Sequence, residues 1–259
     1  MDLNGFFEKH PKVAVAFSGG VDSSYLLYAA KKYAEDVKAY YVKSAFQPAF
    51  EYEDAVRFAR ELEVSLCVIT VDVLKDKQIV SNPCDRCYYC KQKIFTQILE
   101  KAGEDDFDVV LDGTNASDDA SDRPGMKALT ELKVLSPLRE CGLSKNMIRT
   151  LSKEAGLFTW DKPAYACLAT RLPVDRKITF EALEITEVSE AYMAKLGFSD
   201  FRVRMLQTGE GMELGKGSVA KIEICEDQMP LLVEKRKEIF TELKKYYSRV
   251  LLDLEMRNE

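Results

Sequence analysis

A strand-like apolar run leads directly into a loop of small residues and then into a helix. The run is VAVAF at residues 13–17, the loop is SGGVDSS at 18–24, and helical spacing of apolar residues occupies 22–34. A continuous apolar run is typical of a strand buried on both faces, as in parallel sheets. Glycines let backbone N–H groups approach phosphate oxygens, and a helix start adds partial positive charge. The feature predicts an anion-binding α/β fold, with an ordinary capped turn as the alternative interpretation.

This loop differs from two common nucleotide-binding loops. It has no lysine at the position where the G-x-x-x-x-G-K-[ST] loop reaches a γ-phosphate, and it is not G-x-G-x-x-G. Its hydroxyl groups, on Ser18, Ser23 and Ser24, can donate further hydrogen bonds. The loop therefore predicts a different way of holding phosphate groups.

Strands and helices alternate through the first part of the chain. Strands are predicted at 37–43, 65–72 and 109–114, and helices at 51–64, 88–101 and 144–156. Such alternation predicts an α/β domain with a doubly wound, Rossmann-like parallel sheet.

The pattern changes after a loop at residues 157–178. Helices are then predicted at 179–196 and 229–247, and strands at 201–206, 219–225 and 250–255. Adjacent strands framed by helices predict a smaller C-terminal α+β domain. We place the boundary at residue 166, which gives domains 1–166 and 167–259.

Charge and composition favour a cytoplasmic protein that acts on small molecules. The net charge is −6, whereas proteins that grip long nucleic acids usually carry a basic face. No stretch approaches the ~20 apolar residues that span a bilayer, and the first residues lack the apolar region of a signal peptide. We expect neither a membrane nor a nucleic acid as partner. The single histidine, His10, precedes the first strand in a polar stretch, so a surface role is expected for it.

A second polar loop follows the fourth predicted strand, at residues 112–129. Ligands of open parallel sheets bind beyond the carboxyl ends of the strands, so this loop should face the first one. Its carboxylates could bind metal and its arginine could bind phosphate or carboxylate; these residues are Asp112, Asp118, Asp119, Asp122 and Arg123. A solvated acidic turn is an equally weighted interpretation for each aspartate.

Three of the seven cysteines, Cys84, Cys87 and Cys90, form a CxxCxxC motif. Cytosolic cysteines rarely form disulfides, and thiols at this spacing can reach one metal centre. Zinc would require a fourth ligand, whereas a [4Fe–4S] cluster can accept three cysteines and keep one iron open. Cys167 is the distant candidate partner. Three uncoordinated thiols are the alternative.

The segment FSGGVDSS at residues 17–24 resembles the motif of the PP-loop ATP pyrophosphatases, which cleave ATP to AMP and pyrophosphate. In that family the loop holds the pyrophosphate part, and AMP is transferred to the substrate as an activated adenylate. The resemblance implies that Asp22 assists through Mg²⁺, because a carboxylate close to polyphosphate needs an intervening cation. It also implies that ATP is bound by Ser18, Gly19, Gly20, Asp22, Ser23 and Ser24.

Further segments resemble one branch of this superfamily, the LarE-type sulfur transferases, which mature the nickel-pincer cofactor of lactate racemase. These segments are GTNASDDASDRPG (113–125), SPL (136–138) and PAYACLATRLP (163–173), and the resemblance covers nearly the whole chain. It implies that Thr114 and Asn115 also bind the nucleotide and that Cys167 is the sulfur centre.

Two sulfur-transfer modes are known in that family. Some members give up the sulfur of this cysteine and keep dehydroalanine, whereas others hold a [4Fe–4S] cluster and pass on a bound sulfide. The RCYYC pair favours the cluster type, held by Cys87, Cys90 and Cys167. Cys84 has no assigned place and could replace one ligand or carry sulfur.

The strand predicted at 201–206 places Arg202 and Arg204 on one face, because strand side chains alternate. Two neighbouring guanidinium groups need an anion or carboxylates between them. The family resemblance assigns both arginines to a substrate phosphate, with Glu190 and Glu223 near the same site and Arg171 as a further substrate contact. An exposed edge strand with surface salt bridges is the alternative.

These features predict an ATP-dependent sulfur transferase that forms AMP and pyrophosphate. By resemblance, its substrate is a pyridinium dicarboxylate mononucleotide, which becomes a thiocarboxylate with sulfide or another donor as the sulfur source. A PP-loop tRNA-thiolating enzyme and a degenerate nucleotide-binding module are the alternatives. A homo-oligomer is expected. Sequence leaves open the sulfur-transfer mode, the choice among the four cysteines, the physiological donor and the oligomeric state.

Overall fold

The computed structural model describes residues 2–118, 124–206 and 214–257. The chain divides into two units, each considered by itself: unit 1 is Met1–Val71 with Asp85–Ala164, and unit 2 is Asp72–Cys84 with Tyr165–Glu259. The sequence-based division at residue 166 keeps residues 72–84 with the first domain, whereas in the structure they group with unit 2.

Unit 1 is built around a parallel sheet in the order β3-β2-β1-β4. The strands are β1 (Lys12–Ala16), β2 (Asp36–Lys43), β3 (Leu66–Thr70) and β4 (Val110–Leu111). The central strand β1 pairs in parallel with both β2 and β4, and Val13, Ala14 and Val15 are fully buried within it. The predicted α/β class with a parallel sheet is confirmed.

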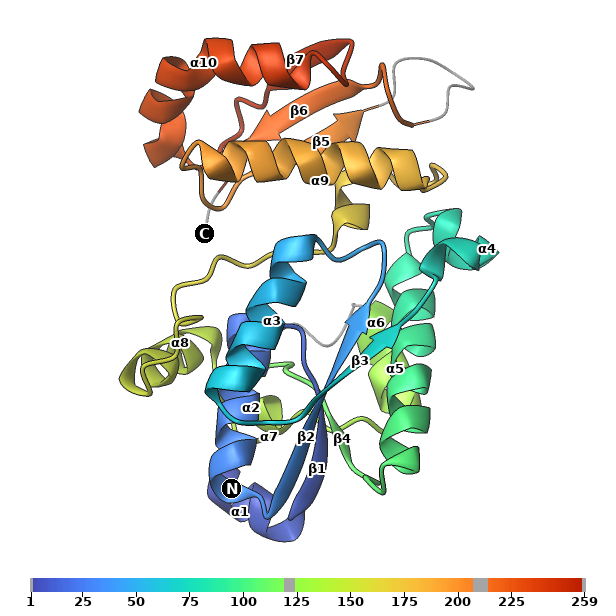
Figure 1. The fold of residues 1–259 in the computed structure, drawn as a ribbon, viewed down its shortest axis with the longest axis vertical. Coiled ribbons are helices and arrows are strands. Elements are labelled where there is room, and N and C mark those ends of the chain that lie inside the picture. The colour runs from blue at the N-terminus through green and yellow to red at the C-terminus, as the bar shows by residue number, and fades with distance from the viewer. Residues whose placement is uncertain (1, 119–123, 207–213, 258–259) are drawn as a thin grey trace. The chain divides into compact units, whose positions relative to one another are not determined.

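The helices of unit 1 lie on both faces of this sheet, with α2 and α3 on one face and α5 and α6 on the other (Figure 1). Their bounds are α1 (Leu3–Lys9), α2 (Val21–Tyr33), α3 (Ala49–Glu61), α5 (Arg86–Glu104), α6 (Pro124–Glu131), α7 (Pro137–Glu140) and α8 (Lys145–Glu154). The sequence analysis missed α1, α6 and α7. The first of these carries a recognisable signal, because Asp2 caps it and its buried residues Leu3, Phe6 and Phe7 have helical spacing.

Unit 2 contains a three-stranded sheet in the order β5-β6-β7. The strands are β5 (Arg202–Leu206), β6 (Val219–Glu223) and β7 (Arg249–Leu252), with β5 antiparallel and β7 parallel to β6. The helical elements are η1 (Val73–Lys75), α4 (Lys77–Val80), η2 (Leu168–Arg171), α9 (Phe180–Lys195), η3 (Glu226–Gln228) and α10 (Met229–Leu243). This small mixed sheet with helices agrees with the predicted α+β region.

Residues 72–84, which lead into the cysteine motif, form backbone and side-chain hydrogen bonds with the rest of unit 2. Asn82 is fully buried, and its amide Nδ2 donates to the carbonyl oxygen of Pro173 at 2.7 Å. The backbone N–H of Asp175 donates to the carbonyl of Asn82, and that of Ile178 to the carbonyl of Val80. Residues 72–84 therefore belong with unit 2 although they precede α5 in the chain. No helix in the described ranges is long and apolar enough to cross a membrane.

Candidate active site

The glycine-rich loop after β1 is closed by its own hydrogen bonds. Gly19 has φ of +78°, and a Cβ atom there would lie 3.2 Å from the carbonyl oxygen of Glu51, so glycine is required on both counts. The hydroxyl of Ser23 accepts from the backbone N–H of Ser18 and donates to the carbonyl of Gly20. Gly20 is the N-cap of α2, so the loop delivers the chain to a helix N-terminus.

Asp22 projects from the first turn of α2 and has two different oxygen environments. Its Oδ2 accepts a hydrogen bond from Nζ of Lys145 at 2.5 Å. Its Oδ1 is buried and has no hydrogen-bond partner among the described residues. An unsatisfied buried oxygen is costly unless a ligand completes it, so this carboxylate fits a site that receives a cation.

The loop that follows β4 lies against this first loop. A Cβ atom on Gly113 would come within 2.9 Å of the backbone nitrogen of Ser23, which shows how closely the two loops approach. The hydroxyls of Thr114 and Ser136 each donate to one carboxylate oxygen of Asp112, both at 2.5 Å. The structure therefore brings the predicted second loop to the first.

Asn115 shapes the second loop through local hydrogen bonds. Its side-chain oxygen accepts from the backbone N–H of Ser117, and its own backbone N–H donates to Asp118. The hydroxyl of Ser117 accepts from the backbone N–H of Lys145, so this loop also fixes the start of α8. Three further predicted ligands, Asp119, Asp122 and Arg123, lie outside the described residues.

A cavity of about 290 Å³ opens between the two loops. It is lined by Ala16, Ser18, Gly20, Asp22, Ser23, Lys91, Phe95, Asp112, Gly113, Thr114 and Asp118. Three of these carry carboxylates and one carries an amine, so a polyphosphate would need an added cation. Within the described ranges, no group of three or more His, Cys, Asp or Glu side chains could hold a metal by itself. Mg²⁺ commonly uses one or two carboxylates and completes its ligand set with phosphate oxygens and water, which these residues can accommodate.

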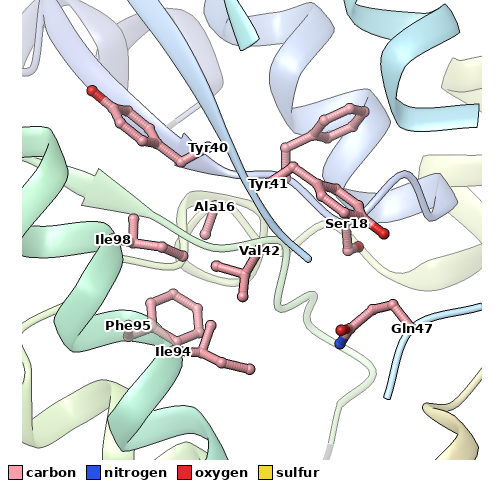
Figure 2. A pocket seen from close by; sticks show the side chains of 10 residues that line it. Ala16, Ser18, Tyr40, Tyr41, Val42, Gln47, Ile94, Phe95 and Ile98 are labelled. Carbon is pink, nitrogen blue, oxygen red and sulfur yellow. The ribbon is translucent and has the colours of Figure 1, made fainter. Parts of the chain in front are cut away.

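A second, smaller cavity of about 130 Å³ adjoins the first and shares Ala16, Ser18 and Phe95 with it. Its walls are mainly apolar side chains of β2 and α5, including Val42, Ile94 and Ile98 (Figure 2). A flat apolar ring fits such walls. The sequence analysis named none of these wall residues, because apolar residues on a strand and a helix look the same whether they fill a core or line a pocket.

Two lysines that the sequence analysis did not single out contact the glycine-rich loop. Nζ of Lys145 pairs with Asp22, and Nζ of Lys162 donates to the carbonyl oxygen of Gly19 at 3.2 Å and to Asp54 at 2.6 Å. Both lysines are far from the loop in sequence. Ser144, the N-cap of α8, indicates in the sequence where this helix begins. No sequence pattern connects the amines of Lys145 and Lys162 with the glycine-rich loop.

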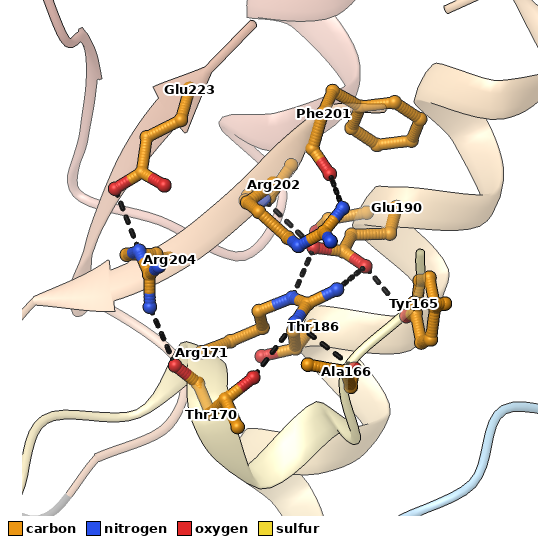
Figure 3. Close-up of polar contacts among 12 residues, drawn as sticks. Tyr165, Ala166, Thr170, Arg171, Thr186, Glu190, Phe201, Arg202, Arg204 and Glu223 are labelled. Atoms are coloured by element: carbon orange, nitrogen blue, oxygen red, sulfur yellow. Dashed lines mark hydrogen bonds and ion pairs between the residues drawn. The ribbon is translucent and has the colours of Figure 1, made fainter. Parts of the chain in front are cut away.

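Unit 2 contains a buried ion pair between Arg171 and Glu190 (Figure 3). The guanidinium donates to both carboxylate oxygens of Glu190, at 2.7 and 3.1 Å, and its side chain is 1% exposed. Glu190 also accepts from the Tyr165 hydroxyl at 2.6 Å and from the backbone N–H of Val203. The sequence analysis expects Arg171 to contact substrate; its burial and these bonds instead favour a positioning role.

The same guanidinium shapes the segment that carries Cys167. It donates to the carbonyl of Ala166 and to the hydroxyl of Thr170. That hydroxyl in turn donates to the carbonyl of Cys167 at 2.8 Å. The Cys167 backbone is therefore linked to Glu190 on α9 through Thr170 and Arg171.

Replacing Glu190 with alanine should destabilise the protein by about 3–5 kcal/mol, because it leaves a buried guanidinium unpaired. The free energy of unfolding in denaturant measures this. Glu184, exposed on the same helix α9, gives the matched control: Glu184→Ala should change stability by no more than about 0.5 kcal/mol. Equal stabilities of the two variants would show that the pair is not structural.

Arg202 and Arg204 differ in their surroundings although they share one strand. Arg204 is part-exposed, and its guanidinium donates to Glu223 and to the carbonyl of Thr170, both at 2.6 Å. Arg202 is buried and donates to the carbonyl of Phe201. Burial and the positive charges of Arg171 and Arg257 lower the pKa of Arg202 to about 10. The cluster therefore brings several guanidinium groups together, and carboxylates of Asp200, Glu190 and Glu223 lie between them.

The cysteines of the CxxCxxC motif are divided between the two units. Cys87 and Cys90 lie in the first two turns of α5 in unit 1, whereas Cys84 and Cys167 belong to unit 2. Cys84 and Cys87 are exposed, and Cys90 and Cys167 are half-buried. Burial raises the pKa of Cys141 and of Cys225, which disfavours the thiolate form that binds metal.

Comparison with known proteins gives two kinds of match. A family model described as queuosine biosynthesis protein QueC matches residues 12–82. An uncharacterised protein of Synechocystis is 32% identical over 90% of this chain and 84% of its own length. The pyridinium-3,5-bisthiocarboxylic acid mononucleotide synthase of Lactiplantibacillus plantarum is 30% identical over 84% of this chain and 80% of its own length.

A shorter match joins the chain to enzymes that act on RNA. The tRNA-specific 2-thiouridylase MnmA of Thermotoga neapolitana is 30% identical over 46% of this chain and 40% of its own length. This likeness covers less of either protein than the likeness to the mononucleotide synthase.

Proposed function

Because the chain belongs to the LarE-type family of PP-loop sulfur transferases, we propose that it activates a carboxylate of a pyridinium dicarboxylate mononucleotide with ATP and converts it to a thiocarboxylate. The product would serve nickel-pincer cofactor biosynthesis. The observation that carries the proposal is the cavity between the two loops, which Asp22 and the residues at the N-terminus of α2 line. Oδ1 of this same Asp22 is buried and has no hydrogen-bond partner among the described residues. This arrangement suits a magnesium-bound polyphosphate.

ATP would lie with its base in the apolar cavity of Figure 2 and its phosphates in the adjoining polar cavity. Candidate nucleotide contacts are Ser18, Gly19, Gly20, Asp22, Ser23, Ser24, Thr114 and Asn115. Of these, Ser24 is fully buried, and its hydroxyl has no hydrogen-bond partner in the described part of the chain. Mg²⁺, held by Asp22 and the phosphates, would supply positive charge against the pyrophosphate.

In the first step, a substrate carboxylate oxygen would attack the α-phosphorus of ATP. A new O–P bond forms while the bond from the α-phosphorus to the bridging oxygen breaks, and its electron pair leaves on pyrophosphate. The Gly20 N–H and the N-terminus of α2 are fixed in advance, so they stabilise developing negative charge without rearrangement. The activated product is an acyl-adenylate.

In the second step, a sulfur nucleophile would attack the acyl carbon and AMP would leave. Cys167 is proposed as the sulfur centre, and its backbone is held in place by Thr170 and Arg171. Thiolates suit iron–sulfur ligation, so we propose that Cys87, Cys90 and Cys167 hold a [4Fe–4S] cluster, with Cys84 as a replacement ligand. When bound, such a cluster would supply the sulfide for the transfer. Direct loss of the Cys167 sulfur is the competing mode.

The arginine cluster around Arg202 and Arg204 is proposed to bind the phosphate of the mononucleotide, with Glu190 and Glu223 near the same site. Glu223 already pairs with Arg204 and with Lys221. An arriving phosphate would compete with the carboxylate of Glu223 for Arg204.

Arg204→Ala should raise the KM for the mononucleotide about 10- to 100-fold, because a charge-assisted contact contributes roughly 1.5–3 kcal/mol. Arg202→Ala should act in the same direction, and the KM for ATP should stay nearly constant in both variants. Steady-state kinetics measures these values. Arg249→Ala, an exposed arginine on β7 of the same sheet, should leave both KM values unchanged. An equal rise for the dephosphorylated substrate would contradict the assignment to phosphate.

The tRNA-thiolating alternative uses the same activation of a substrate by AMP. The partial match to a thiouridylase supports it, but the shorter coverage and the net charge of −6 favour a small-molecule substrate. We also propose a cytoplasmic location and a homo-oligomeric state.

The nucleotide product tests the proposed chemistry. Protein supplied with Mg²⁺, ATP and the mononucleotide should release AMP and pyrophosphate in equal amounts. Release of ADP and phosphate would contradict it. The same products with tRNA, and none with the mononucleotide, would support the thiolation alternative.

A further inference from the structure

A lysine side chain forms a hydrogen bond with the peptide group between Gly19 and Gly20. Nζ of Lys162 donates to the carbonyl oxygen of Gly19 at 3.2 Å. The C=O and N–H of a trans peptide point in opposite directions, so the N–H of Gly20 is directed away from Lys162. Gly20 lines the cavity between the two loops, and Lys162 does not.

Lys162 is itself fixed by several neighbours. Nζ lies 2.6 Å from a carboxylate oxygen of Asp54 on α3, and the lysine side chain is 14% exposed. The Lys162 ammonium also lies over the ring of Phe50. The guanidinium of Arg149 donates to the carbonyls of Trp160 and Lys162. A lysine held at its backbone and at its ammonium can impose one orientation on the peptide that it contacts.

We propose that Lys162 is a positioning residue that aims the Gly20 N–H into the cavity as a donor for the pyrophosphate part of the nucleotide. This inference rests on the proposed function and deepens it. An isolated glycine pair can rotate its peptide plane easily, because glycine accepts many backbone conformations. The ammonium removes that freedom before the nucleotide arrives, which is the preorganisation that makes such donors effective.

The position of Lys162 in the chain adds a second consequence. It precedes Cys167 by five residues in the segment DKPAYAC. The hydrogen bond from Lys162 to Gly19 therefore also fixes the start of the segment that leads to Cys167, the proposed sulfur centre. A change at Lys162 is expected to disturb pyrophosphate binding through Gly20.

Selective ¹⁵N labelling of glycine provides a direct test, because the chain has 13 glycines. The Gly20 signal is identified by its loss in Gly20→Ala, where the added Cβ would meet only the Ser18 hydroxyl at 3.6 Å. In the unmodified protein, the Gly20 amide should shift when Mg²⁺ and inorganic pyrophosphate are added. In Lys162→Met that shift should be lost, and pyrophosphate affinity should fall roughly 10- to 100-fold, the size expected for losing one hydrogen bond to a charged group.

Three further variants complete the test. Lys162→Arg should recover part of the affinity, because it restores a cationic donor. Lys153→Met removes an exposed lysine that lies over Trp160 and does not touch the loop, and it should bind pyrophosphate like the unmodified protein. If Lys162→Met does not fold, Asp54→Asn is used as the test variant in its place. This change weakens the ion pair that fixes the Lys162 ammonium, so it should lower the affinity for pyrophosphate.

Two results separate failure of this inference from failure of the proposed function. If the unmodified protein releases AMP and pyrophosphate while Lys162→Met keeps full pyrophosphate affinity and the Gly20 shift, the positioning role is wrong and the function stands. Unchanged affinity in Asp54→Asn, where that variant is used, would likewise overturn the positioning role. If the unmodified protein neither binds pyrophosphate nor forms AMP, the proposed function fails first.

Discussion

Replacing Asp22 with alanine is expected to reduce pyrophosphate release from ATP by at least about 10²- to 10³-fold, comparable to losing a preorganised electrostatic group from an active site. Asp22 lines the cavity, and its buried Oδ1 has no hydrogen-bond partner in the described part of the chain; α2 carries no other carboxylate that could take its place. Asp22→Asn, which keeps the shape and removes the charge, should show nearly the same loss. A pyrophosphate-release assay with a fixed mononucleotide concentration measures both variants.

The loss should not come from unfolding. The pair between Lys145 and Asp22 is partly open to solvent, at 29% and 22% side-chain exposure, so breaking it should cost at most about 1 kcal/mol. Thermal unfolding of Asp22→Ala should therefore stay close to that of the unmodified protein. Asp36→Ala, at the exposed start of β2, provides the control with normal activity. Full activity in Asp22→Ala would remove Asp22 from the mechanism.

Replacing Cys167 with alanine is expected to abolish thiocarboxylate formation while AMP and pyrophosphate are still formed. The glycine-rich loop and its cavity lie in unit 1, whereas Cys167 lies in unit 2, so the two steps should separate in this variant. Mass spectrometry of the mononucleotide and a nucleotide assay on the same sample measure both steps. Cys141→Ala, at a half-buried thiol of unit 1, should retain both. Thiocarboxylate formation by Cys167→Ala at the normal rate would exclude this residue as the sulfur centre.

The mass of the protein after reaction distinguishes the two sulfur-transfer modes. With a cluster on Cys87, Cys90 and Cys167, the enzyme should turn over repeatedly with added sulfide, and its polypeptide mass should not change. Each of the three Cys→Ala changes should then weaken the iron–sulfur absorption of anaerobically purified protein, and Cys84→Ala should weaken it less. The competing mode predicts one turnover and loss of one sulfur and two hydrogens at Cys167. Dehydroalanine at Cys167 in cluster-loaded enzyme would defeat the cluster proposal.

The sequence predicted the alternating core of unit 1 well, because its strands and helices follow strong apolar periodicity. It predicted β4 less well. The expected strand at 109–114 ends after Leu111, because Asp112 and Thr114 leave the sheet to form the second loop and bond each other. The structure groups residues 72–84 with unit 2. No sequence pattern indicates this, because the hydrogen bond between Asn82 and Pro173 forms only in the folded protein.

The sequence predicted those parts of the candidate site whose residues are contiguous. It did not predict contacts between residues that are far apart in the sequence. The glycine-rich loop is one segment, so its motif could be recognised. Lys145 and Lys162 contact it across 123 and 143 residues, and lysine side chains usually face solvent. The family resemblance placed Arg171 at the substrate, whereas its buried pairing with Glu190 of α9 is visible only in the folded protein. Contacts of this kind follow from packing, which local sequence patterns do not encode.

The central claim is that one carboxylate oxygen of a pyridinium dicarboxylate mononucleotide is exchanged for sulfur at the expense of ATP. The most direct measurement is mass spectrometry of that mononucleotide after incubation with the protein, Mg²⁺, ATP and ³⁴S-labelled sulfide, with AMP counted in the same reaction. The account predicts a product that has exchanged oxygen for labelled sulfur, with one AMP formed for each exchange. An unchanged mononucleotide beside sulfur-labelled tRNA, or exchange without AMP, would contradict it.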